Sequence, residues 1–88
     1  MDFYSSFPRV SVAYSVDASG NKYFGEAPSG TKSDKPGWQI CRMTLIGGTV
    51  NWIMHYPVDP ATNRASSSSV FVWNSATDAT YTYRELGT

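Results

Sequence analysis

His55 is the first residue to consider for chemistry, because it is the only histidine in the chain. An imidazole general base or an imidazole metal ligand would have to be this side chain. It lies in an alternating stretch on the side opposite Met54 and Tyr56, which indicates that it faces solvent or an interface. The sequence has no Gly-x-Ser-x-Gly elbow that would present a serine nucleophile. We therefore predict that the chain is not an enzyme, since catalysis would require His55 and a carboxylate to converge in one pocket.

The segment 25–33, Gly-Glu-Ala-Pro-Ser-Gly-Thr-Lys-Ser, partly matches a phosphate-binding loop. In such a loop the lysine directly follows the second glycine, so that its amine reaches the phosphates. Here Thr31 stands before Lys32. The loop also needs a helix directly after it, whereas Pro36 and Gly37 follow almost at once. Nucleotide binding is therefore not expected.

Metal ligands are too few or wrongly spaced. Cys41 and His55 make two ligands, whereas a closed structural zinc site takes four. Four acidic residues in predicted loops lack the alternating spacing of a calcium loop; they are Asp17, Asp34, Asp59 and Asp78. No cofactor is expected. Cys41, the only cysteine, lies in an apolar run and is expected to be a buried thiol.

Charge and hydropathy restrict the classes of partner. Seven basic and seven acidic residues give a formal net charge of zero, and neither sign forms a run that could neutralise phosphates. No stretch of about 18 apolar residues is present to span a bilayer, and residues 1–6 lack the features of a signal peptide. We expect a soluble protein, made in the cytoplasm, with no nucleic-acid or membrane partner.

The segments that carry these side chains are predicted to be β-strands. From residue 9 to residue 16, apolar residues alternate with serine and alanine, which is typical of a half-buried strand. Turn residues follow at 17–21, and the extended pattern resumes at 22–27, so a first hairpin is predicted. The segment 28–37 is rich in proline, glycine, serine and lysine and is predicted to be a loop.

The second half of the chain continues the pattern. Residues 38–46 are apolar on both faces, which predicts a central strand with both faces covered. Gly47-Gly48 is a two-residue connection typical of a hairpin, so the alternating stretch 50–56 should pair with 38–46 antiparallel. Two further short strands are expected after a long connection, at 70–73 and 80–83, around a turn at 74–78.

Six strands and no convincing helix predict an all-β fold, a small antiparallel sandwich or barrel of about six strands. We expect an N-terminal arm at 1–8 and a single β domain at 9–88. Only two leucines are present, whereas aromatic residues make up 15% of the chain. The rings are therefore expected to form the core or a subunit interface. Three tryptophans and a tyrosine pair could instead line a sugar- or base-stacking platform; they are Trp38, Trp52, Trp73, Tyr81 and Tyr83.

Several segments resemble a pattern that recurs in short virion-associated structural proteins of tailed bacteriophages. Residues 23–34 and 38–43 resemble Tyr-x-Gly-x-Ala, a Gly-Thr-x-x-Ser-Asp loop and Trp-x-Ile-x-Arg, although the loop here, Gly-Thr-Lys-Ser-Asp at 30–34, has one residue between its threonine and serine where the pattern has two. Residues 71–74 and 80–83 resemble the closing tryptophan turn and the tyrosine-rich strand of that family. The family usually has an arginine in the turn after that tryptophan, where this chain has Ser-Ala-Thr at 75–77.

This resemblance implies a non-enzymatic component of the virion head, neck or tail that is present in many copies. Its partners would be other virion proteins, including further copies of itself, held by shape and aromatic contacts. The framework or interface residues would be Trp38, Arg42, Trp52, Trp73, Tyr81 and Tyr83, with the loop 28–37 and the arm 1–8 as contact elements. The alternative function is a small carbohydrate-binding module that contacts host surface glycans, in which two tryptophans are exposed and coplanar.

Overall fold

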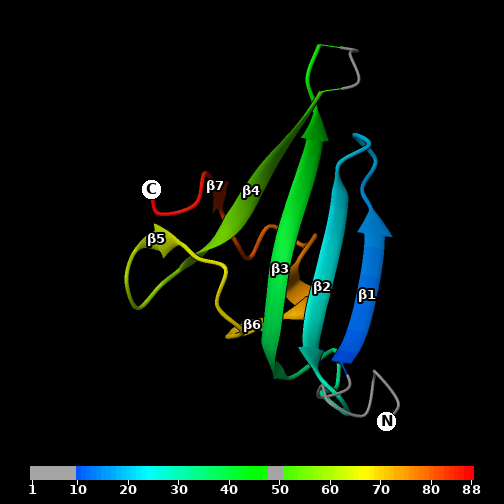
Figure 1. Ribbon diagram of the computed structural model, residues 1–88, viewed down its shortest axis with the longest axis vertical. Coiled ribbons are helices and arrows are strands. Elements are labelled where there is room, and N and C mark those ends of the chain that lie inside the picture. The colour runs from blue at the N-terminus through cyan, green and yellow to red at the C-terminus, as the bar shows by residue number, and fades with distance from the viewer. Residues whose placement is uncertain (1–9, 48–50) are drawn as a thin grey trace, which may run out of the picture.

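The computed structural model describes residues 10–47 and 51–88, which contain seven β-strands and one 3-10 turn at Trp73–Ser75 (Figure 1). The strands are β1 (Val10–Val16), β2 (Lys22–Pro28), β3 (Pro36–Leu45), β4 (Trp52–Asp59), β5 (Arg64–Ala65), β6 (Phe71–Val72) and β7 (Tyr83–Arg84). Every pairing among them is antiparallel. The predicted all-β fold is confirmed, and the sheet at its centre is open.

The hairpin predicted at the start of the domain is present, and β1 and β2 pair along their whole lengths. Asp17 holds the turn between them. Its Oδ1 accepts hydrogen bonds from the backbone N–H of Ser19 at 2.9 Å and of Asn21 at 3.0 Å. Gly20 takes the positive φ of 86° that the turn requires. Hydrogen bonding, above all from the Asn21 side chain, holds the pKa of Asp17 below its usual range.

β3 is the central strand, and two other strands share one of its edges. β2 pairs with its first edge, while β4 pairs with the second edge from Arg42 to Leu45 and β6 pairs with the same edge at Pro36 and Trp38. Beyond His55, β4 therefore leaves β3 and pairs with β7 and then β5 (Figure 1). The sheet divides at this point.

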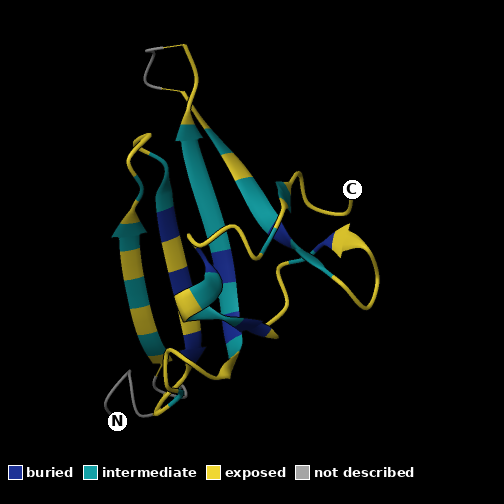
Figure 2. Ribbon diagram, turned by 180° about the vertical axis from the view of Figure 1, so that it is seen from behind, coloured by how far each residue is buried: buried dark blue, intermediate teal, exposed yellow. Residues whose placement is uncertain are grey.

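Within the described chain, one face of the sheet is covered and the other is open. β6, the 3-10 turn and the segment that leads to β7 cross the covered face (Figure 2). The buried core lies between them and the sheet, and it consists of Tyr23, Ala27, Trp38, Ile40, Phe71 and Ala76. Partly buried side chains that pack against it are Ala13, Trp73, Tyr81 and Tyr83.

The prediction that the third strand is covered on both faces is wrong. Trp38 and Ile40 are buried on one face of β3, whereas Leu45 is 40% exposed on the other. A central strand pairs with a neighbouring strand along each edge, but this pairing does not cover its faces. Each face is covered only where another segment of the chain packs onto it. The segment after residue 70 supplies that layer on one face only.

The predicted two-residue connection at Gly47-Gly48 is also wrong. Such a turn would place Leu45 opposite Val50, whereas Leu45 lies opposite Trp52. The backbone N–H of Ile46 donates to the carbonyl of Asn51 at 3.1 Å, so the connection runs over residues 47–50. A shift of two residues keeps every side chain on the same face, so hydrophobic alternation cannot distinguish the two registers.

The remaining boundaries differ by small amounts. The strand expected at 70–73 is β6, and it ends where the 3-10 turn begins. The strand expected at 80–83 is the two-residue β7, and β5 was not predicted, because two-residue strands carry no periodic pattern. The arm at 1–8 and most of the 47–50 connection lie outside the described residues. No described helix has the length and hydrophobicity needed to cross a membrane.

Candidate functional site

The strand residues that carry the phage-protein resemblance, those of Tyr-x-Gly-x-Ala and Trp-x-Ile-x-Arg, bring their matched side chains together on the covered face. Tyr23 of β2 pairs with Arg42 of β3, and Gly25 pairs with Ile40. Side chains alternate along a strand, so the residues two positions apart in Tyr-x-Gly-x-Ala and Trp-x-Ile-x-Arg face the same side. That side is the core, where Ile40 and Tyr23 are buried. The two patterns therefore supply the side chains with which β2 and β3 contribute to the core.

Gly25 is required where two tryptophans pack onto the sheet. The ring centroids of Trp38 and Trp73 are 5.9 Å apart at an interplanar angle of 40°. A Cβ atom at Gly25 would lie 2.5 Å from Cε3 of Trp73 and 3.1 Å from Cε3 of Trp38. Only a glycine admits the Trp73 ring this close to the strand.

The loop at 28–37 is tied to this core. Trp38 Nε1 donates to the carbonyl oxygen of Lys32 at 3.0 Å, and the carbonyl of Ser33 accepts the backbone N–H of Asn74 at 2.9 Å. Most of the loop residues are exposed. The loop thus has its backbone fixed beside the tryptophan pair while its side chains meet solvent.

Tyr81 and Tyr83, which were predicted as framework residues, pack against the core and hydrogen-bond to the backbone beside it. Tyr81 packs edge-on against Phe71 at 5.2 Å, and its hydroxyl accepts the backbone N–H of Val72 at 2.9 Å. Tyr83 packs edge-on against Tyr23 at 5.6 Å, and its hydroxyl donates to the carbonyl of Ala76 at 2.8 Å. Burial raises the pKa of Tyr83 far above its usual range, so the phenol stays neutral.

Arg42 and His55 form one polar side-chain contact on the covered face, and the Tyr23 hydroxyl, which donates to Oδ2 of Asp17 at 3.0 Å, forms another. Arg42 Nη2 lies 3.2 Å from His55 Nδ1, and the guanidinium sits 5.0 Å from the centroid of the Tyr83 ring. The Nε of Arg42 is buried without a hydrogen-bond partner. His55 was predicted to face solvent or an interface, and it is instead half-buried beside an arginine because its register partner on β3 is Arg42.

The described residues bring no catalytic or metal-binding set together. The hydrogen-bond partner of His55 is a guanidinium, and a carboxylate is what would orient an imidazole for general-base work. No group of three His, Cys, Asp or Glu residues is close enough to hold a metal ion in the described parts of the chain. The covered face is therefore best described as a packed core.

The other face of the sheet is apolar and open, and we call it the open face. Viewed in Figure 1, no described segment crosses the front of β1, β2 and β3. Most of the large hydrophobic residues that alternate outward on β1–β4 are exposed, Val12 by 72% and Met54 by 49%. The exposed members are Val10, Val12, Tyr14, Val16, Phe24, Leu45, Trp52 and Met54.

β1 shows this arrangement most clearly. Its burial alternates between exposed and half-buried residues, and the exposed set is the apolar one. The half-buried set, Ser11, Ala13 and Ser15, points to the covered face, where Ala13 packs against the core. The strand thus turns its small residues to its own core and its valines and Tyr14 to solvent.

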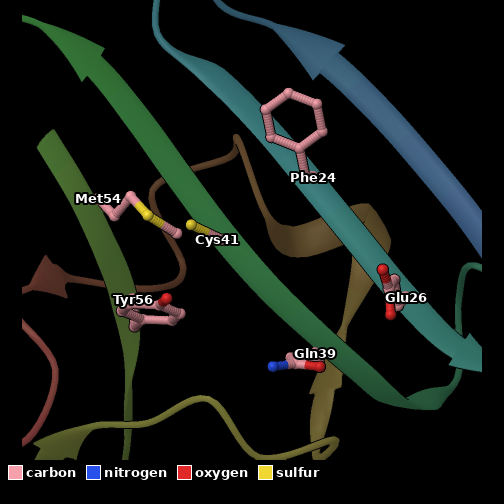
Figure 3. A pocket seen from close by; sticks show the side chains of 6 residues that line it. All are labelled: Phe24, Glu26, Gln39, Cys41, Met54 and Tyr56. Atoms are coloured by element: carbon pink, nitrogen blue, oxygen red, sulfur yellow. The ribbon is translucent and has the colours of Figure 1, made fainter. Parts of the chain in front are cut away.

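A shallow depression of about 270 Å³ lies in the open face where β4 leaves β3 (Figure 3). Its lining residues are Phe24, Glu26, Gln39, Cys41, Met54 and Tyr56. Burial raises the pKa of the Cys41 thiol, which keeps the sulfur protonated and poorly nucleophilic. Burial also raises the pKa of Tyr56. The depression offers apolar contact area with a polar rim.

Trp52 is the only tryptophan on the open face as the structure describes it. It is 37% exposed, and the ammonium of Lys22 lies 4.8 Å from the centroid of its ring. Trp38 is buried, and Trp73 is half-buried against it. The sequence correctly placed Trp52, Met54 and Tyr56 on one face, but it did not identify the valines of β1 as part of the same surface.

No protein-family model, curated protein or solved structure matches this chain. The resemblance to phage virion proteins accordingly stays a prediction.

Proposed function

We propose that this chain is a non-enzymatic structural or assembly module that acts by protein–protein docking through its open face. We further propose that it does so as a head, neck or tail component of a tailed-phage virion. The setting rests on the sequence resemblance, and the mode of action rests on the exposed apolar surface of β1–β4.

The observation that carries the proposal is the size and continuity of that apolar surface. Isolated exposed hydrophobic residues are normal on monomeric proteins, whereas contiguous patches of more than a few hundred Å² mark interaction surfaces. Tyr14 lies opposite Phe24, and Met43 lies opposite Met54, so the apolar residues sit on neighbouring strands. β1 turns its valines and Tyr14 to this face, and docking would remove these exposed apolar side chains from water.

The carbohydrate-binding alternative has less support. It needs two exposed, coplanar tryptophans, because flat rings stack on sugar faces. Trp38 and Trp73 pack against each other in the core at 40°, which leaves Trp52 alone on the open face.

The test is the composition of purified particles. We expect the chain in gradient-purified virions of a phage that encodes it, at many copies per particle by quantitative mass spectrometry. A variant with Val12→Lys and Met54→Lys should be incorporated at least about tenfold less, because docking would bury two unpaired ammonium groups. The matched control carries Thr62→Lys and Thr77→Lys, which add the same charge at exposed positions away from the open face.

Circular dichroism must first show that both variants keep the β-sheet spectrum of the wild-type chain. Wild-type protein missing from the particles would overturn the virion setting. Incorporation of the Val12→Lys, Met54→Lys variant at the wild-type level would overturn docking through the open face.

A further inference from the structure

The open face has the area that a stable interface needs. From their exposed fractions, its eight exposed apolar residues present roughly 750 Å² of surface, and a stable complex buries about 800 Å² per partner. The half-buried neighbours on β3 and β4 add to this area. Two sheets that pack face to face form a β-sandwich about 10 Å thick, and this chain supplies one such sheet with one face already covered.

The charges on the open face are self-complementary. Among the outward-facing residues of β1, β2, β3 and the 52–56 part of β4, only Lys22 and Glu26 are charged. They flank Phe24 on the same strand, two residues away on either side. Their Cα atoms are therefore about 13 Å apart, with the aromatic ring midway between them.

We infer that the occupant of the open face is a second copy of this chain, packed face to face about a two-fold axis that passes over Phe24. The axis lies in the interface and runs across the strands, so β2 crosses the partner's β2 in the opposite direction. This places Lys22 against the partner's Glu26 and Glu26 against the partner's Lys22. The inference rests on the proposed docking function and adds the identity of the partner.

The charge pattern favours this arrangement over the aligned packing in which the axis runs along the strands. Such an axis over β2 would set Lys22 against the partner's Lys22, and over a neighbouring strand it would set Lys22 against uncharged residues. Burying an unpaired charge costs several kcal/mol, whereas a paired arrangement recovers most of that cost. The axis across the strands forms both ion pairs at once, because isologous contacts always occur twice.

The test is a reciprocal charge swap, followed by analytical ultracentrifugation of the purified full chain. Lys22→Glu alone sets glutamate against glutamate in both pairs, and Glu26→Lys alone sets lysine against lysine. Each single variant should raise the dimer dissociation constant by roughly 10-fold to 100-fold at low salt. The double variant, Lys22→Glu with Glu26→Lys, should dimerise close to the wild-type level.

Mixing the two single variants gives the sharpest result. In a mixed dimer both contacts join a glutamate of the Lys22→Glu chain to a lysine of the Glu26→Lys chain, so an equimolar mixture should associate about as tightly as wild type. The loss of the Lys22 contact with Trp52 cannot explain such rescue, because the Lys22→Glu chain still lacks that contact in the mixture. Lys35→Glu in the exposed loop is the control and should leave dimerisation unchanged.

Three outcomes would overturn the inference. They are a wild-type chain that stays monomeric at high micromolar concentration, single variants that dimerise like wild type, and a mixture that shows no rescue. Alkylation of Cys41, which lines the depression, should also slow as dimer forms, whereas pairing through the β1 edge would leave it unchanged. A monomeric chain that is still incorporated into particles through the open face would contradict the second copy and leave the docking function standing.

Discussion

Replacing Trp38 with alanine is expected to lower the free energy of unfolding by about 4 kcal/mol, the usual cost of deleting a buried aromatic side chain. Trp38 is 3% exposed, packs against Trp73 and donates its indole N–H to Lys32. The substitution removes both the ring and the hydrogen bond that holds the 28–37 loop. Small domains are stable by only about 0.05–0.15 kcal/mol per residue, so this loss removes a large share of the total.

The matched control is Trp52→Ala, which removes the same side chain from the open face. Trp52 is 37% exposed, and we expect a loss of at most about 2 kcal/mol in the monomer, half of that for Trp38→Ala. Urea denaturation followed by circular dichroism, at a protein concentration too low for association, measures both values. Equal losses for the two variants would contradict the division of the sheet into a core face and an open face.

Gly25→Ala is expected to cost about 2–3 kcal/mol, the upper range for overpacking a core. The added methyl group would sit 2.5 Å from Cε3 of Trp73, so either the ring or the strand has to move. At an ordinary strand position the same substitution would be mildly stabilising, because alanine loses less backbone entropy on folding than glycine. The sign of the effect therefore reports the Trp73 contact.

A double-mutant cycle isolates that contact. In a Trp73→Ala background the methyl group meets only Cε3 of Trp38, at 3.1 Å, so a small shift of that ring accommodates it and Gly25→Ala should cost well under about 1 kcal/mol. The two single losses should thus fail to add, by about 2 kcal/mol or more, as is found for side chains in direct contact. Additive losses would mean that Gly25 is needed for some reason other than the approach of the Trp73 ring.

The strands of the first hairpin and of the central sheet could be predicted from alternation, because a period of two is a property of the extended backbone itself. Alternation does not say which face the chain covers with its own residues. In β1 the alternating valines and Tyr14 would be expected to face the core. Instead the small residues Ser11, Ala13 and Ser15 face it. Large rings from residues 71–83 fill that space, so β1 needs small side chains there.

Contacts that depend on register could not be predicted. The meeting of Arg42 with His55 follows from a connection at 47–50 that is two residues longer than Gly47-Gly48 implied. The departure of β4 from β3 depends on β6, which comes from much later in the sequence and takes the same edge. The candidate residue Trp52 was placed on the correct face, but the open face as a surface appears only when β1 to β4 lie side by side.

Hydroxyl-radical footprinting of the assembled protein is the most direct measurement of whether the open face is a docking surface. Tyr14 and Met54 are exposed on that face and react readily as oxidation probes, while Tyr81 lies on the covered side as an internal reference. We predict that oxidation of Tyr14 and Met54 falls several-fold between the dilute chain and the assembled protein, with Tyr81 unchanged. Equal oxidation of Tyr14 and Met54 in the two states, in a sample that has assembled, would contradict the account.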